Sequence, residues 1–208
     1  MPVLTNDEID RFLSEREILL RIGVNGLDGF PLVTPIWFIY DDQAVYFTPR
    51  EKSVWFKCLR ADARVSLCID EEAQPYRKIL IKGTAELVQD VGEDDKWREM
   101  YLLMASRYVP EAGARAYVNN TIKEPRGLYR VNLATSSVKS WRMPVADEDP
   151  MGIWHQRYYL PETRFQDINR ESKFLGSLLV LLSLMHLARI GMPSLMVSSS
   201  RWPNANLR

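Results

Sequence analysis

The sequence is poor in the residues that build disulfides, metal sites and nucleophilic catalytic groups. Its 208 residues include two cysteines, Cys58 and Cys68, which form no CxxC motif. The histidines are His155 and His186, so no metal site of recognisable spacing exists. No nucleophile–base pair can be recognised either. An enzyme with this sequence would therefore need a cofactor to supply its chemistry.

The sequence also lacks an excess of charge and an N-terminal leader. Twenty-seven basic residues balance 27 acidic ones, which argues against nucleic acid or another polyanion as a partner. The opening residues, MPVLTNDEID, contain neither a basic n-region nor an apolar h-region. We therefore expect a reduced, cytoplasmic protein. The length suits one domain, with or without an appendage.

Strand and helix patterns are interleaved over most of the chain. Thr5 and Glu8 form a capping-box pattern ahead of a helix over 6–15, and helical spacing recurs at 53–62, 93–108 and 110–120. Short turns join the first three strands into an expected antiparallel meander. Gly83 interrupts a long strand, as at a bulge or a barrel corner. The predicted strands cover 17–25, 31–40, 44–48, 64–70, 77–89, 127–134 and 137–143. Six or seven mostly sequential strands with peripheral helices predict a mainly β fold, a closed or nearly closed antiparallel β-barrel.

The strand over 31–40 is apolar on both faces. A sheet with one wet face alternates apolar and polar residues, so either a partner subunit or the helices must cover this strand. Pro35 stands in its middle and cannot donate a ladder hydrogen bond. We therefore expect Pro35 at an edge or a bulge, where a ligand could approach.

The stretch TPREKS (48–53) combines a turn with several groups that bind anions. Ser53 stands at the expected N-cap of the helix over 53–62, whose first turn carries free N–H groups and a partial positive charge. Thr48 adds a hydroxyl, and Arg50, Lys52 and Lys57 add positive charge. One interpretation is a phosphate site; the other is a capped helix in a solvated turn. A second candidate, Tyr76 with Arg77 at a strand start, suits a planar anion or is an ordinary strand end.

Five pieces of the sequence stand in a specific order and spacing: D-G-x-P (28–31), TPIWF (34–38), T…S…LR (48–60), ARVSLCID (63–70) and PYRKILIKGTAE (75–86). On these pieces, residues 23–88 resemble the pyridoxamine 5′-phosphate oxidase-like split β-barrel superfamily, in particular its flavin- and deazaflavin (F420)-dependent oxidoreductases. The resemblance extends more loosely through 127–143 and 149–159. It implies that residues 1–160 form a six-stranded split barrel, which works as a homodimer with cofactor sites at the subunit interface.

The resemblance also implies which residues contact the cofactor. Trp55 stands where many members of the superfamily carry lysine, so it would stack on the cofactor or simply pack. Weaker candidates are Tyr76, Arg77 and Trp141. The implied phosphate contacts are Thr48, Arg50, Lys52, Ser53 and Lys57, and the implied ring contacts are Pro35, Ile36, Trp37 and Phe38.

The function implied by the resemblance is hydride transfer between a bound cofactor, FMN or alternatively F420, and a small organic substrate. The alternative is a non-catalytic flavin or haem carrier on the same barrel. A haem site needs an axial ligand. His155 and His186 both lie outside the barrel strands, which argues against haem. The C-terminal substrate-binding segment of true pyridoxamine phosphate oxidases is not found, so we do not expect vitamin B6 synthesis.

The residues beyond about 160 match no pattern of this superfamily. Within this extension, 161–208, the segment 174–197 is strongly apolar, but its uncharged core is shorter than the roughly 20 residues that a membrane span needs. We expect this apolar helical segment to pack on the dimer or to belong to a non-family extension. Contact with a membrane is the less favoured alternative.

Overall fold

The computed structural model describes residues 2–145 and 148. They belong to the first of two units of the chain, Met1–Trp154. The predicted extension 161–208, its apolar segment 174–197 and both histidines lie outside the described residues. Within the described part, no helix combines the length and the apolar character needed to cross a bilayer.

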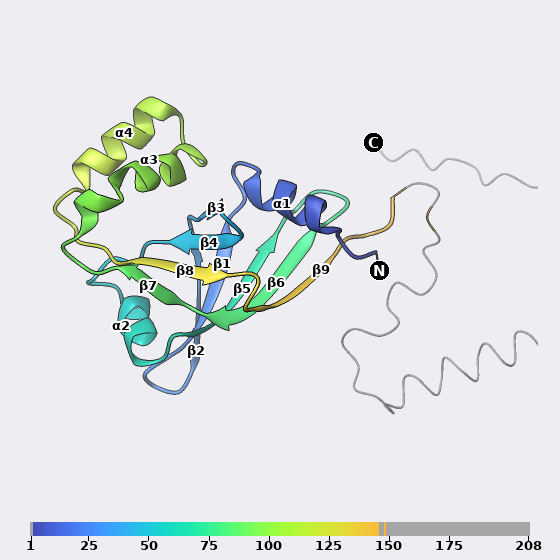
Figure 1. Ribbon diagram of the computed structural model, residues 1–208, viewed down its shortest axis with the longest axis horizontal. Helices are drawn as coiled ribbons and strands as arrows, with labels where there is room; N and C mark the ends of the chain where they lie inside the picture. The colour runs from blue at the N-terminus through green and yellow to red at the C-terminus, as the bar shows by residue number, and fades with distance from the viewer. Residues whose placement is uncertain (1, 146–147, 149–208) are drawn as a thin grey trace, which may run out of the picture. The chain divides into compact units, whose positions relative to one another are not determined.

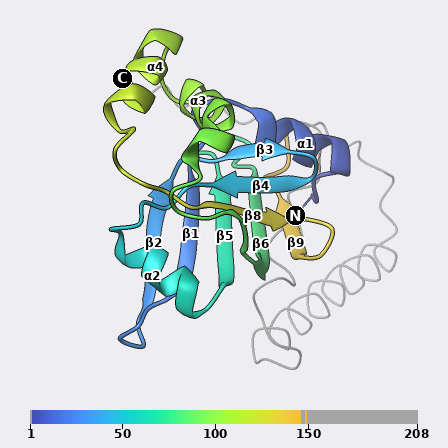
Figure 2. The same cartoon turned by 60° about the vertical axis from the view of Figure 1, so that its left-hand side comes forward.

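Two antiparallel sheets form the framework (Figure 1). The larger sheet has the order β2-β1-β5-β6-β9 and the smaller one the order β3-β4-β8-β7. The strands of the smaller sheet run across those of the larger one (Figure 2). Because the two sheets stay separate, the fold is a split barrel and not the closed barrel that the strand pattern allowed. The larger sheet comprises β1 (Leu20–Asn25), β2 (Pro31–Ile36), β5 (Arg64–Asp70), β6 (Lys78–Thr84) and β9 (Ser137–Trp141), and the smaller one β3 (Ile39–Asp41), β4 (Ala44–Phe47), β7 (Glu86–Gln89) and β8 (Leu128–Asn132).

Two of the predicted strands are each divided between the sheets. The run 31–40 was wrong as one strand: β2 ends at Ile36, and Trp37 and Phe38 carry the chain across to β3. The antiparallel pairings of the predicted meander are present, β1 with β2 and β3 with β4, but they lie in two different sheets. The run 77–89 breaks after β6, close to Gly83, where an added Cβ would lie 2.3 Å from Oγ of Ser136. These two crossings turn seven predicted strands into nine within the described residues.

Local sequence signals place three of the four predicted helices correctly within the described residues. In α1 (Asn6–Ser14), the Thr5 hydroxyl accepts from the Glu8 amide at 3.3 Å and the Glu8 carboxylate accepts from the Thr5 amide at 2.7 Å, which confirms the capping box. The predicted helix over 93–108 is interrupted at Trp97. The helices α3 and α4 lie side by side at one end of the smaller sheet (Figure 1). The other elements are α2 (Val54–Ala61), the 3-10 turn η1 (Asp94–Lys96), α3 (Arg98–Ser106) and α4 (Glu111–Asn120).

The apolar side chains form two clusters, one on each face of β4. Val45 and Phe47 belong to the cluster between the sheets, whereas Ala44 and Tyr46 pack with the α3–α4 pair. Burying a large apolar side chain stabilises a fold by about 1.5–3 kcal/mol, so both faces of β4 hold the domain together. The helices also cover Trp37 and Ile39. By contrast, Val33 on edge strand β2 remains 64% exposed.

Candidate functional site

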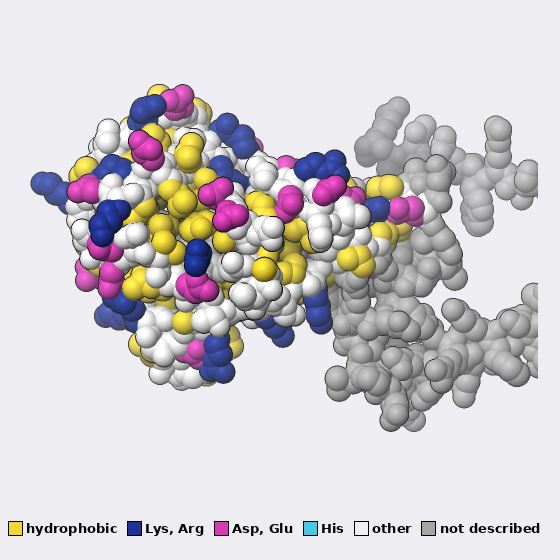
Figure 3. All heavy atoms as spheres, viewed as in Figure 1, with side chains coloured by type: hydrophobic (Ala, Val, Ile, Leu, Met, Phe, Trp, Pro, Cys, Tyr) yellow, Lys and Arg dark blue, Asp and Glu magenta, His cyan; other side chains and the backbone are white. Residues whose placement is uncertain are grey.

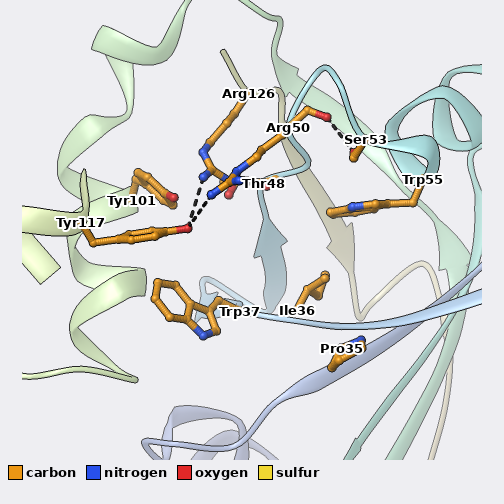
Figure 4. Close-up of a pocket in the computed structure, with 10 residues that line it drawn as sticks. All are labelled: Pro35, Ile36, Trp37, Thr48, Arg50, Ser53, Trp55, Tyr101, Tyr117 and Arg126. Carbon is orange, nitrogen blue, oxygen red and sulfur yellow. Dashed lines mark hydrogen bonds between the residues drawn. The ribbon is translucent and has the colours of Figure 1, made fainter. Parts of the chain in front are cut away.

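A pocket opens where the end of β2, the loop between β4 and α2, and the α3–α4 pair come together (Figure 4). Its volume is about 280 Å³, just below the roughly 300–1,000 Å³ that is common for small-molecule sites. Its lining is aromatic on two sides and cationic between them. The lining residues are Pro35, Ile36, Trp37, Thr48, Arg50, Ser53, Trp55, Tyr101, Tyr117 and Arg126.

Two tryptophans from different elements face the pocket from opposite sides (Figure 4). Trp37, at the crossing between the sheets, stacks on Tyr108 with ring centroids 5.1 Å apart and lies 5.0 Å from the Tyr117 ring. Trp55, in the first turn of α2, lies 6.0 Å from the Phe47 ring. Packing on their outer sides fixes both indoles. A planar ligand between them would therefore meet aromatic walls that are already in place.

Two arginines converge above the aromatic walls. Arg50 and Arg126 each donate to the Tyr117 hydroxyl, at 3.1 and 3.4 Å. Arg126 also donates to the Thr48 carbonyl at 3.3 Å and lies over the Tyr101 ring at 4.7 Å. It is only 6% exposed, and its Nε has no hydrogen-bond partner among the described residues. A buried guanidinium at the wall of a pocket, with no carboxylate paired to it among the described residues, is suited to an anionic ligand.

The arginines also change the acidity of the neighbouring phenols. Burial raises the pKa of Tyr101. Burial opposes ionisation of Tyr117 as well, but the neighbouring Tyr101 hydroxyl, the hydrogen bond from Arg50 and the charges of both arginines outweigh it, so its pKa is lowered. The upper part of the pocket is therefore an electropositive region that favours negative charge.

The structure confirms the N-cap interpretation of TPREKS, and the phosphate-site interpretation stays a prediction. Ser53 is the N-cap of α2: its Oγ accepts from the Phe56 amide at 3.3 Å and donates to the Arg50 carbonyl at 2.7 Å. The same residue lines the pocket together with Thr48 and Arg50. The cap therefore places the positive end of α2 beside the arginines.

The structure brings only some of the predicted site residues together. Pro35, Ile36 and Trp37 line the pocket, but the Phe38 side chain is fully buried in the core and its amide donates to the Tyr108 hydroxyl at 3.1 Å. Lys57 is exposed on α2 and does not line the pocket. Lys52 does not line it either, because it donates to Glu124 at 2.7 Å.

Three further candidates lie elsewhere in the described domain. Trp141 is on β9, at the edge of the larger sheet opposite β2, and is buried. Tyr76 is a half-exposed loop residue ahead of β6. Arg77 makes paired hydrogen bonds to Glu15 and Glu71 and covers the Phe12 ring at 4.4 Å. Within this chain, these contacts give Arg77 a structural role that ties α1 to the loop between β5 and β6.

Replacing Arg77 by alanine is expected to lower the stability of the domain and the pH dependence of that stability. Partial burial raises the pKa of Glu71, but hydrogen bonds from the Arg77 side chain and backbone outweigh it and lower the pKa. A lowered carboxyl pKa stabilises the fold above about pH 4.3, and this contribution is lost as the pH falls through the folded-state pKa. Urea unfolding between pH 3 and 7 should show a loss of about 1–3 kcal/mol at pH 7 for Arg77→Ala, shrinking toward pH 3. An equal loss at both ends of the range would contradict this role.

The sequence pattern did not single out Arg126, Tyr101 or Tyr117 as site residues. The antiparallel register that pairs Phe47 with Tyr129 continues to a bridge between Arg50 and Arg126. Had β4 been paired with β8 from the sequence, this register would have placed Arg126 opposite Arg50. The tyrosines reach the pocket because α3 and α4 dock on the outer face of β4, which no local pattern encodes.

Comparison with solved structures supports the fold. A conserved hypothetical protein from Mycobacterium tuberculosis has a TM-score of 0.54 and 23% identity, over 71% of this chain and 93% of that one. A FAD and haem binding protein from Mycobacterium smegmatis has a TM-score of 0.51 and 16% identity, over 70% and 74% of the two chains. HutZ, the haem storage protein from Vibrio cholerae, has a TM-score of 0.50 and 18% identity, over 64% and 94%. At these identities the likeness establishes the fold alone.

Comparison of the sequence with known families gives the assignment. No curated protein matches the chain significantly. The family model described as pyridoxamine 5′-phosphate oxidase matches residues 5–140, well over half of the chain and every described helix and almost every strand residue. The chain therefore belongs to the pyridoxamine 5′-phosphate oxidase family of split β-barrels.

Proposed function

We propose that this protein binds a phosphate-bearing flavin-type cofactor, FMN or alternatively F420, and works with it as an oxidoreductase. The observation that carries the proposal is the convergence of Arg50 and buried Arg126 beside two opposed tryptophans in one pocket. The arginines suit a phosphate group, and the indoles suit a fused planar ring. Membership of the family supports the same assignment.

The residues of the pocket fit such a cofactor. A buried donor without an acceptor costs about 1–3 kcal/mol, and the Nε of Arg126 is such a donor. A phosphate group beside the Arg126 guanidinium, which lines the pocket, would offset its buried charge. Further polar groups lie near the arginines: the hydroxyls of Thr48 and Ser53 and the first turn of α2.

The protein's own contribution would be binding, orientation and exclusion of water. When bound, the flavin-type ring supplies hydride chemistry, which no side chain of the pocket provides. Arg50 and Arg126 would hold the phosphate, while Trp37 and Trp55 would orient the ring. The stack of Trp37 on Tyr108 would keep water from one side of the cofactor ring. The substrate would be a small organic molecule that approaches the remaining face of the ring.

The site is expected to be completed by a second copy of the chain. The pocket volume lies below the common range for ligand sites, and edge strand β2 leaves Val33 64% exposed. Hydrophobic side chains also gather on the face viewed in Figure 3, between the α3–α4 pair and α2, with charged side chains around them. An exposed apolar surface of this kind supports a homodimer, and sedimentation of the purified protein measures its mass directly.

A non-catalytic carrier is the second candidate function. The same fold occurs in a FAD and haem binding protein and in a haem storage protein, so it is compatible with a carrier. No histidine occurs in residues 2–145, so that part of the chain offers no imidazole as an axial haem ligand. Turnover of the bound cofactor with a reductant would separate an oxidoreductase from a carrier.

Replacing both Arg50 and Ser53 by alanine is expected to weaken FMN binding without unfolding the domain. The double variant removes one phosphate-binding cation and the N-cap hydroxyl, so we expect a loss of about 10- to 100-fold in affinity. Titration with FMN, followed by flavin fluorescence, measures the change. Lys57→Ala is the matched control, because it removes an exposed charge outside the pocket and should leave the affinity within about twofold. Unchanged affinity in the double variant would remove the anion site from the proposal.

A further inference from the structure

Glu124 makes ion pairs with both cations of TPREKS, Arg50 and Lys52. It follows α4 and precedes β8, in the segment that also carries Arg126. Its Oε1 accepts from Lys52 at 2.7 Å, and its Oε2 lies 3.0 Å from the Nε of Arg50. The charge of Arg50, which the proposed cofactor phosphate would need, is therefore already shared with a carboxylate of the chain itself.

The contact between Glu124 and Arg50 is an ion pair without a well-aligned hydrogen bond. Its distance is that of an ion pair, yet Oε2 is buried and accepts no hydrogen bond of acceptable angle from the described residues. Coulomb attraction therefore holds the pair without the directional bond that makes an arginine–carboxylate pair strong. A ligand with several acceptor oxygens and a larger negative charge would bind Arg50 better than Glu124 does.

The backbone around Glu124 is held independently of its side chain. The Glu51 amide donates to the Pro125 carbonyl at 3.0 Å, and the Gly127 amide donates to the Pro49 carbonyl at 3.2 Å. The Arg126 amide donates to Asp94 at 3.1 Å. Glu124 could therefore leave Arg50 by a change of side-chain rotamer, while Arg126 stays in the pocket.

We propose that Glu124 is an internal competitor for the anion site, which occupies Arg50 until a phosphate group displaces it. The inference rests on the proposed function for the identity of the natural ligand, although the competition itself concerns any phosphate at this site. Glu124 would then set the affinity of the site for phosphate. Its contact with Arg50 is strong enough to hold the arginine in place and weak enough for a phosphate group to replace it. Lys52, 68% exposed, would remain the partner of the displaced carboxylate.

The test compares the wild-type protein with Glu124→Gln, which keeps the size of the side chain and removes its charge. Inorganic phosphate is the first probe. Its binding is measured by the rise in Tm with phosphate concentration at constant ionic strength. The second probe is a pair of compounds, FMN and riboflavin, which differ only by the phosphate. The binding of each is measured by flavin fluorescence. Glu86→Gln is the matched control, because Glu86 pairs with Arg130 at 2.8 Å on the sheet and does not line the pocket.

We expect Glu124→Gln to bind inorganic phosphate and FMN about five- to tenfold more tightly than wild type, as removal of one nearby negative charge predicts. Riboflavin affinity should stay within about twofold, and Glu86→Gln should behave as wild type. If Glu124→Gln does not fold, Glu124→Asp replaces it; its shorter side chain cannot reach both cations equally well, and tighter phosphate binding is again expected.

The outcomes separate this inference from the proposed function. If the variant binds inorganic phosphate no more tightly than wild type, the competition is overturned, even when FMN binds both proteins well. A gain for riboflavin equal to that for FMN also overturns it, because the effect then does not act through the anion. Tighter phosphate binding without binding of FMN or F420 to either protein supports the competition and refutes the proposed cofactor.

Discussion

Replacing Arg126 by alanine is expected to weaken FMN binding on the order of a hundredfold. Arg126 is buried at 6% exposure, it lines the pocket, and its Nε lacks a partner among the described residues. A charge-assisted hydrogen bond made in such a desolvated place contributes more than one made at the surface. Riboflavin, which has no phosphate, should lose little affinity, so the ratio of the two dissociation constants reports the phosphate contact alone.

Two further variants make the Arg126 result specific. Arg126→Lys keeps the charge but not the planar fork of donors, so we expect it to recover part of the affinity. Arg130→Ala removes an exposed arginine on β8 that pairs with Glu86, and it should bind FMN as wild type does. Because Arg126 also bonds the Thr48 carbonyl, Tm is measured for each variant. Equal losses for FMN and riboflavin in a folded Arg126→Ala protein would show that Arg126 does not bind the phosphate.

Replacing Phe38 by alanine is expected to lower the free energy of unfolding by about 3–5 kcal/mol. The Phe38 ring is fully buried in the core between the sheets, and the Arg107 guanidinium lies over it at 4.4 Å. Its removal would leave a cavity that the surrounding side chains can fill only in part. Urea unfolding measures the loss, which should appear as a lower midpoint with a similar slope.

The same substitution tests the place of Phe38 in the cofactor site. Its side chain lies in the core and not on the pocket, so the folded protein should bind FMN within about threefold of wild type, well below the loss expected for a removed ligand contact. Leu27→Ala, in the turn before β2 and 64% exposed, should change stability by no more than about 0.5 kcal/mol. A Phe38→Ala protein of unchanged stability that loses FMN affinity tenfold would return Phe38 to the ring contacts that the family resemblance implied.

Local signals in the sequence determined much of the framework. The capping pattern at Thr5, the N-cap at Ser53 and the alternation over 64–70 predicted α1, α2 and β5 nearly residue by residue. Pro35 predicted an edge or a bulge, and β2 is an edge strand. Each of these signals acts between residues at most a few positions apart, so it survives without knowledge of the rest of the chain.

The tertiary structure decided which charges reach the pocket. Lys52 and Lys57 are close to Ser53 in sequence but do not line the pocket, whereas Arg126 does so through the register of β4 with β8. The sequence likewise did not reveal the crossing at Trp37 and Phe38, because an apolar run reads the same whether it stays in one sheet or passes to a second. Sequence by itself determined the elements and one side of the site; the pairing of distant strands and the docking of α3 and α4 determined the other side, because those contacts join residues far apart in the chain.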